Sequence, residues 1–140
     1  MPLHLEIVTA ERAVLAEDDV DQVVAPGADG QLTILPRHAS LITLLQPGEL
    51  RIRRRGEERV FAVSGGFMEV HHSRVRILAD AAEQSEEIDV QRAQAAEERA
   101  RALLSNRHQV DDLPAAYVAL RRSQVRLRVA RRRRVNAPAG

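Results

Sequence analysis

The chain has 140 residues and a net charge of +1; 44% of its residues are hydrophobic, 29% are charged and 2% are aromatic. This composition supports a packed core in one ordinary domain or two small ones, and it argues against disorder. Because there is no cysteine and all 21 basic residues are arginine, disulfides, thiolate nucleophiles, cysteine-bound zinc, a P-loop lysine and a lysine Schiff base are excluded.

Residues 3 to about 80 alternate between apolar and polar side chains. Leu3, Leu5 and Ile7 are separated by His4 and Glu6, and the same period recurs at residues 50–53 and 74–77. This alternation is the pattern of strands with one solvent-exposed face. Turn-forming residues break the region at short intervals, at positions 26–27, 29–30, 36, 47–48, 56 and 65–66. Many short strands separated by such turns predict an antiparallel β-sandwich or flattened barrel of about ten strands over residues 1–84.

The hydrophobic period changes near Ser85, which we expect to cap a first helix. Apolar positions then recur three and four residues apart, which marks one face of a helix, at Ala93, Ala96, Ala100 and Leu103. After a polar break at residues 106–111, Asp112 is placed to cap a second helix. The stripe of that helix has the same spacing at Leu113, Tyr117, Leu120, Gln124 and Leu127. The pattern predicts a two-helix antiparallel hairpin within residues 85–140.

The expected hairpin has a thin apolar seam and an uneven charge. Its first helix offers mostly alanine, and each missing methylene forfeits about 0.8 kcal/mol of burial, so the helices should be held together weakly, which suits a switch. Residues 1–112 contain 13 arginines and all 20 acidic residues, whereas residues 113–140 contain 8 arginines and no acid. The C-terminal segment is therefore either a surface for an acidic partner or a solvated helix face.

Three parts of the chain resemble the epsilon chains of F-type ATP synthases. The first reads GQLTILPRHA at residues 30–39 and continues through LITLL at 41–45 to PGELRI at 47–52. The second reads FAVSGGFMEV at 61–70, and the third reads VRILADAAE at 75–83 and runs into IDVQRA at 88–93. They occur in the family's order, and the match covers residues 1 to about 130. The family's fold, an N-terminal β-sandwich and a C-terminal helical hairpin, agrees with the fold expected from the hydrophobic periods.

The resemblance implies a non-catalytic subunit in the central rotor stalk of a proton-translocating synthase, with no catalytic residue, no metal and no required cofactor. The sandwich would dock on the gamma subunit and the ring of c-subunits, with contacts at Asp29, Gly30, Arg37, His38 and Ser40. The hairpin would either fold up or extend along gamma, where it would inhibit ATP hydrolysis. In the catalytic head of alpha and beta subunits, acidic segments of the beta subunits would then face a basic surface made of Arg121, Arg122, Arg126, Arg128, Arg131, Arg132, Arg133 and Arg134.

The resemblance also bears on localisation. No apolar run reaches the length of a membrane span, and the first ten residues do not read as a signal or transit peptide. We therefore expect a peripheral protein on the cytoplasmic face of the bacterial plasma membrane, as part of the synthase.

Residues 88–93 also match the Ile/Leu-Asp-x-x-Arg-Ala signature of relatives that bind ATP on the folded hairpin, which leaves ATP as a candidate regulatory ligand. The candidate residues are Glu83, Asp89, Arg92, Arg99, Arg122 and Arg126. The arginines share one face in each helix, and converging guanidinium groups suit a phosphate chain. The ATP-binding relatives carry further arginines where this chain has Leu103 and Ala115. The competing interpretation is an Asp89–Arg92 surface pair beside a solvated arginine face.

Other chemistries find less support. His71 and His72 are adjacent on an expected strand, so they should point to opposite faces rather than share a metal. Ser64-Gly65-Gly66 lacks the Gly-Lys-Ser/Thr of a phosphate loop and is better explained as a bulge or tight turn. A nucleic-acid-binding module would explain the arginine-rich C-terminal segment, but the rest of the chain is acidic and offers no aromatic platform for bases. A small-molecule enzyme is disfavoured because lysine, cysteine and an apolar pocket with paired carboxylates are lacking.

Overall fold

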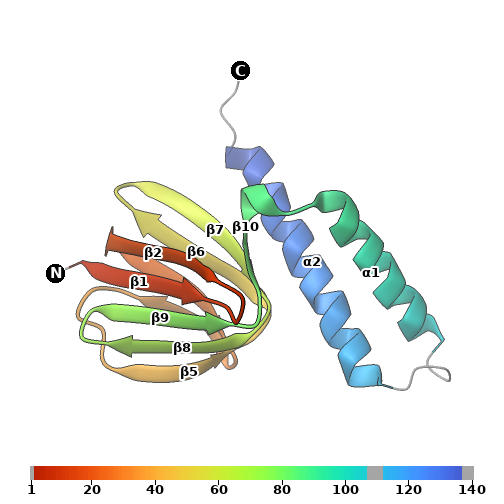
Figure 1. The fold of residues 1–140 in the computed structure, drawn as a ribbon, viewed down its shortest axis with the longest axis horizontal. Coiled ribbons are helices and arrows are strands. Elements are labelled where there is room, and N and C mark those ends of the chain that lie inside the picture. Colours follow the sequence, from red (N-terminus) through yellow and green to blue (C-terminus); the bar gives the residue numbers. More distant parts are fainter. Residues whose placement is uncertain (1, 107–111, 137–140) are drawn as a thin grey trace. The chain divides into compact units, whose positions relative to one another are not determined.

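The computed structural model describes residues 2–106 and 112–136, with side chains in the last helix described as far as residue 132. The chain divides into two compact units, Met1–Gln84 and Ser85–Gly140. The first unit consists of strands (Figure 1), which are β1 (Leu3–Val8), β2 (Ala13–Val20), β3 (Gln22–Gly27), β4 (Gly30–Ile34), β5 (Leu41–Leu45), β6 (Gly48–Arg54), β7 (Glu57–Val63), β8 (Gly66–His71), β9 (Arg74–Ala79) and β10 (Ala82–Gln84). The expected sandwich of about ten strands is confirmed.

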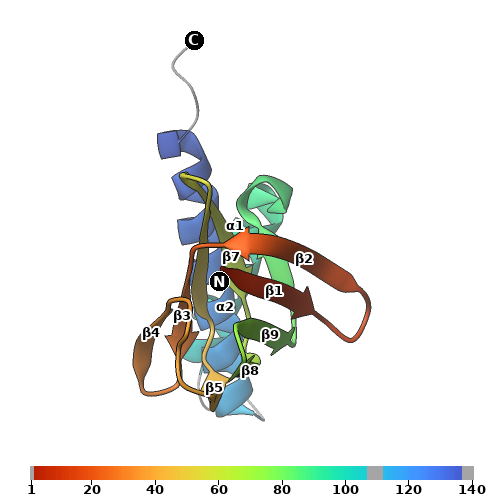
Figure 2. The same cartoon turned by 90° about the vertical axis from the view of Figure 1, so that its left-hand side faces the viewer.

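The strands form one hydrogen-bonded sheet that curves back on itself (Figure 2). Its order is β10-β7-β6-β3-β5-β8-β9-β1-β2, and β4 pairs with β3. Among the described residues all strand pairs are antiparallel except β1 and β9, which run parallel from His4 beside Arg74 to Val8 beside Leu78. The expected antiparallel sandwich is confirmed, with this parallel pair as the exception among the described strands. A hairpin ties β1 to β2 on one edge only, so its other edge can accept a distant strand in either direction.

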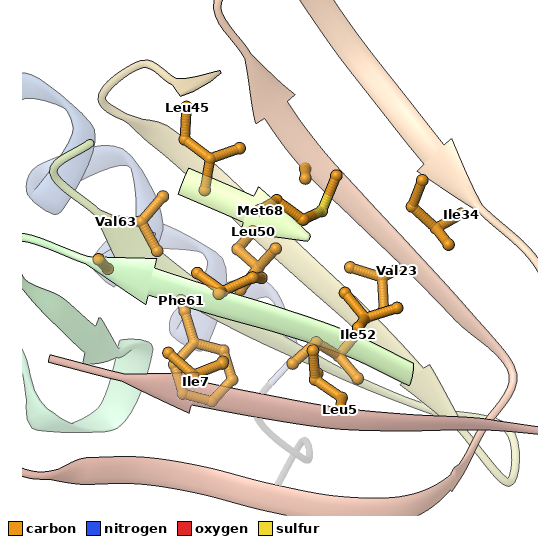
Figure 3. Packing of buried hydrophobic residues seen from close by; sticks show 14 of the residues in the cluster. Leu5, Ile7, Val23, Ile34, Leu45, Leu50, Ile52, Phe61, Val63 and Met68 are labelled. Atoms are coloured by element: carbon orange, nitrogen blue, oxygen red, sulfur yellow. The ribbon is translucent and has the colours of Figure 1, made fainter. Parts of the chain in front are cut away.

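Alternate residues of the strands point into a common core (Figure 3). Leu5 and Ile7 of β1, Ile52 of β6, Phe61 of β7 and Met68 of β8 are all almost fully buried. Burying a side chain of this size contributes about 1.5–3 kcal/mol. The alternation expected in the first strand is confirmed, because its odd-numbered residues are buried and the residues between them are half-buried.

An ion-pair cluster joins the edge strand β2 to β6 and β7. Glu17 of β2 accepts a hydrogen bond from the Arg59 guanidinium at 3.0 Å, and Nη1 of Arg54 lies 3.3 Å from the same carboxylate. Arg54 also donates from Nε to the main-chain carbonyl of Asp18 at 2.8 Å. The contacts of Glu17 with the two arginines are half-buried, and charged hydrogen bonds are stronger than neutral ones. Together these contacts hold the last strand of the sheet against strands near its other end.

The second unit consists of a 3₁₀ turn, η1 (Ser85–Glu87), and the helices α1 (Val90–Ser105) and α2 (Leu113–Asn136), which lie antiparallel (Figure 1). The expected hairpin is confirmed, but Ser85 does not cap α1. Ser85 is buried in η1, and Asp89 immediately precedes the helix, where its carboxylate accepts the main-chain N–H of Arg92 at 3.1 Å. Asp112 caps α2 as expected by accepting the N–H of Ala115 at 3.0 Å. Of the expected polar break at residues 106–111, Asn106 directly follows α1, and residues 107–111 lie outside the described residues.

The two helices bury mainly small side chains, and not always at the expected positions. Ala93 and Ala100 of α1 are buried, whereas Leu103 is 52% exposed. Tyr117, expected in the stripe of α2, is 45% exposed. The buried residues of α2 instead follow two lines, Ala116, Ser123, Leu127 and Ala130 in one and Val125 and Val129 in the other. Of the expected stripe of α2 only Leu127 is buried, because half of the buried positions of this helix carry alanine or serine, which a pattern of large apolar residues does not mark.

Candidate docking face and arginine-rich helices

One outer face of the sandwich carries a group of exposed apolar side chains. The register pairs Leu44 of β5 with Phe67 of β8, and Phe67 with Leu78 of β9, so the three side chains lie in line across neighbouring strands. Ile42 lies two residues before Leu44 and therefore on the same face. These four side chains, called the apolar patch below, are 47–74% exposed. Contiguous exposed apolar side chains of this kind mark an interaction site.

Two rows of polar side chains continue this face beyond the apolar patch. By register across β8, β9 and β1, the rows are Glu69, Arg76 and Glu6, followed by His71, Arg74 and His4. These side chains line a groove of about 190 Å³. The first polar row adjoins the apolar patch directly, because Ile42 of β5 is the register partner of Glu69. The face therefore passes from apolar to charged side chains within two rows.

Several groove side chains are held by charged neighbours. Arg76 Nε lies 3.3 Å from Glu6 Oε2. His4 Nδ1 lies 2.6 Å from Asp18 Oδ1 of β2, and its Nε2 lies 3.5 Å from Glu6 Oε1. The hydrogen bond with His4, and after it the guanidinium of Arg76, hold the pKa of Glu6 below its ordinary value against an opposing effect of desolvation. The carboxylate of Glu6 therefore makes its charged contacts within the sheet.

The residues expected to contact other subunits lie on the connections around β4. Asp29 lies in the exposed turn between β3 and β4, and Gly30 is the first residue of β4, opposite Gly27 of β3. Arg37 is exposed with a φ of +68°, and His38 Nδ1 lies 2.7 Å from the main-chain carbonyl of the next residue. Ser40 reaches the groove, because its Oγ lies 3.2 Å from Nδ1 of His71. Of this set, the contacts in the structure bring only Ser40 to the polar rows, and a subunit contact by the whole set stays a prediction.

Sequence reasoning missed the apolar patch, although a signal was present. Strand β5 reads LITLL, with apolar side chains at both odd and even positions, and β8 places Phe67 and Met68 side by side. Met68 is buried and Phe67 is exposed. A strand that is apolar on both sides is typical of a sheet covered on both faces, yet the outer side chains of these two strands are exposed in the described part of the chain. The two strands therefore indicate a partner surface.

The candidate nucleotide residues of the hairpin are spread over both helices. Asp89 Oδ2 lies 3.7 Å from Nε of Arg92, whose side chain is 85% exposed, so the surface pair of the competing interpretation is present. Because the helices are antiparallel, the first turns of α1, which contain Arg92, lie beside the C-terminal half of α2, which contains Arg126. Arg99 lies about two turns further along α1, and Arg122 lies about one turn before Arg126.

Three further positions bear on nucleotide binding. Leu103 and Ala115, where ATP-binding relatives carry arginine, are both exposed. Glu83 belongs to β10 of the first unit, where it is half-buried and has polar interactions of its own. A phosphate group on this hairpin would therefore lack two guanidinium contacts.

The arginines of α2 form two rows rather than one. By helical period, Arg121, Arg128 and Arg132 form one row and Arg122 and Arg126 form the other. Arg131 is exposed outside both rows, and the side chains of Arg133 and Arg134 lie outside the described residues. Because α2 contains no acidic residue, each row presents positive charge without a carboxylate on the same helix.

Within the described residues, no three His, Asp or Glu side chains are placed to hold a metal ion. Neither of the two helices, as far as they are described, combines the length and the hydropathy of a membrane-spanning segment. The candidate functional surfaces among the described residues are therefore the apolar patch with its polar rows and the arginine rows of α2.

Two family models match the chain in succession. The model described as ATP synthase, Delta/Epsilon chain, beta-sandwich domain matches residues 2–85. The model described as ATP synthase, Delta/Epsilon chain, long alpha-helix domain matches residues 86–131.

Individual relatives agree with these matches. The chain is 53% identical to the ATP synthase epsilon chain of Herpetosiphon aurantiacus over 134 residues, which is 96% of this chain and 98% of that one. It is 53% identical to the epsilon chain of Chloroflexus aggregans over 130 residues, 93% of each chain. A chain in the mitochondrial ATP synthase structure of Euglena gracilis, titled OSCP/F1/c-ring, has a TM-score of 0.76 at 26% identity and covers 92% of this chain and 81% of that one.

Proposed function

The chain belongs to the ATP synthase delta/epsilon-chain family, and we propose that it serves as a non-catalytic epsilon subunit of the central stalk. Both domains of the family are present in order, and curated epsilon chains match over almost the whole length. The chain is thus a subunit of an enzyme complex. In this proposal the sandwich docks on the rotor, the helices restrain ATP hydrolysis, and the subunit sits peripherally at the cytoplasmic face of the bacterial plasma membrane.

The apolar patch is the observation that carries the docking proposal. Its central residue, Phe67, is 51% exposed and lies between Leu44 and Leu78, and aromatic side chains at the centre of an apolar patch commonly dominate binding energy. We assign the gamma subunit to this patch and the c-ring to the connections at residues 29–40. The Euglena relative comes from an assembly whose title names F1 and the c-ring, which supports rotor partners.

Substituting the central patch residue tests the docking proposal. Phe67→Asp should weaken binding of the full chain to its gamma subunit by about 30-fold or more, because a hot-spot side chain contributes about 2 kcal/mol or more. Calorimetric titration measures the affinity, and circular dichroism confirms the fold. Val118→Asp, which changes a comparably exposed residue of α2, should leave affinity within about twofold. Wild-type affinity in Phe67→Asp would remove the patch from the docking surface.

The arginine rows of α2 support a restraint on hydrolysis. Exposed ion pairs are worth little, whereas desolvated, bidentate Arg–carboxylate pairs are strong, so the rows become effective only when an acidic partner covers them. We assign that partner to acidic segments of the alpha and beta subunits. Ending the chain before Asp112 should leave the separate sandwich unit folded and should raise the ATPase rate of the assembled complex. An unchanged rate with a normally assembled complex would contradict the restraint.

ATP is the candidate ligand of the folded hairpin. Asp89 orients Arg92, and Arg126 belongs to the C-terminal half of α2, which lies beside the first turns of α1. We expect weak binding, because Leu103 and Ala115 supply no guanidinium group. In calorimetry with ATP-Mg, Arg92→Ala should reduce the heat, whereas Leu103→Arg should tighten binding about tenfold if it adds one phosphate contact.

A matched control is available on the same helix. Arg101 of α1 pairs with Glu97 at 3.5 Å and is 60% exposed, so Arg101→Ala removes a surface arginine outside the candidate set. Its titration should equal that of the wild type. No heat from the wild type with millimolar ATP-Mg, or equal heats in Arg92→Ala and Arg101→Ala, would remove ATP as a ligand of this site.

A further inference from the structure

The polar rows beside the apolar patch contain two charged side chains that differ from their neighbours. Glu69 of β8 and Arg74 of β9 are both exposed and both line the groove. Their register partners are Arg76 and His71, respectively, so Glu69 and Arg74 are diagonal neighbours on adjacent strands. At a diagonal position the backbones are about 7–8 Å apart, which long side chains can span but need not.

The other polar side chains of the groove already have partners. Arg76 lies 3.3 Å from Glu6, and His4 lies 2.6 Å from Asp18. His71 lies 3.2 Å from the Ser40 hydroxyl.

Among the residues that the structure describes, neither Glu69 nor Arg74 makes an ion pair or a side-chain hydrogen bond. The groove therefore presents one carboxylate and one guanidinium, at diagonal positions of neighbouring strands, that have no ion-pair partner among the described residues.

The position of this pair relates it to docking. Glu69 is the register partner of Ile42 and lies two residues from Phe67 on the same face of β8, so it borders the apolar patch directly. Arg74 lies one row further out. A partner that covers the patch must also cover or border these charges, and a charge that stays unpaired beneath a partner is costly.

We propose that the subunit docked on the apolar patch presents a basic side chain to Glu69 and an acidic side chain to Arg74. This inference rests on the proposed docking function and adds the charge pattern that the partner must carry. The two pairs set the rotational register of the docked partner, because turning the partner on the patch would bring like charges together. An apolar patch alone, being non-directional, does not define such a register.

Charge reversal of each residue tests the pattern. Glu69→Arg and Arg74→Glu should each weaken binding of the full chain to the gamma subunit by about tenfold or more, because each variant juxtaposes like charges at the rim of the docking surface. The double variant keeps the wild-type net charge but reverses the pattern, and we expect its affinity to fall by about 100-fold because two unfavourable contacts then act together. Calorimetry or biosensor titration at fixed ionic strength measures all three.

Two controls carry the same changes of net charge on the β6–β7 hairpin. Arg53→Glu matches Arg74→Glu, and Glu57→Arg matches Glu69→Arg; both residues are exposed. These controls should bind within about twofold of the wild type at about 0.15 M salt, where the Debye length is about 8 Å.

The outcomes separate this inference from the docking proposal. Wild-type affinity in the double variant would mean that only net charge matters, and it would overturn the pattern. Weak binding by Phe67→Asp together with unaffected charge variants would also overturn the pattern but keep the apolar patch. If Phe67→Asp also binds normally, the docking surface itself is elsewhere.

Discussion

Replacement of Gly66 by alanine should destabilise the sandwich severely. Gly66 begins β8 with a φ of +127°, and a Cβ added there would lie 2.0 Å from the carbonyl oxygen of Leu78 and 2.9 Å from Cα of Ala79. Both atoms belong to the backbone of β9, which pairs with β8 from this residue onward, so relief requires moving a strand. Backbone strain contributes about 1–3 kcal/mol and overpacking about 1–3 kcal/mol or more. The expected loss is therefore about 2–6 kcal/mol.

Gly30 provides the matched control. Its φ is +133°, almost the same as that of Gly66, but a Cβ added there meets no atom within 4 Å. Gly30→Ala should therefore lose only the backbone term of about 1–3 kcal/mol. Thermal unfolding followed by circular dichroism measures both, and each kcal/mol lowers the midpoint of a domain of this size by about 4–8 °C. Equal midpoints for the two variants would refute the argument that the close approach of β9 requires glycine at position 66.

Three further predictions follow from the same contacts. Asp89→Ala should cost about 1 kcal/mol of helix stability and Asp89→Ser much less, which helical circular dichroism during thermal unfolding can separate. Phe61→Ala should cost about 3–5 kcal/mol because the side chain is buried, whereas Phe67→Ala on the exposed patch should cost far less; chemical denaturation compares them. Arg76→Gln should raise the pKa of Glu6 toward its ordinary value, as followed by NMR titration of the carboxyl group. Since the folded-state pKa of Glu6 is lowered, its contribution to stability is present above the unfolded-state pKa and is lost as the pH falls through the folded-state pKa.

Local periodicity determined the secondary structure of this chain. Alternating side chains in residues 3–8 place Leu5 and Ile7 in the core, because successive residues of a strand point to opposite faces. The change to a spacing of three and four residues after Ser85 marks the helices, and Asp112 signals its own capping role. Each of these features depends on residues within a few positions of one another. The local pattern does not choose between Ser85 and Asp89 as the cap of α1, because the side-chain oxygen of either residue can accept an N–H at the start of a helix; in the structure Asp89 does so.

Only the tertiary structure decided which residues form the apolar patch. Leu44, Phe67 and Leu78 come from three strands, and they meet because the register aligns β5, β8 and β9. That register is set by packing of the buried residues on the opposite face of the same strands, which no local pattern specifies. The parallel pairing of β1 with β9 likewise places Glu6 beside Arg76. Side chains that lie far apart in the chain thus become neighbours only because packing of the core fixes the register of the strands.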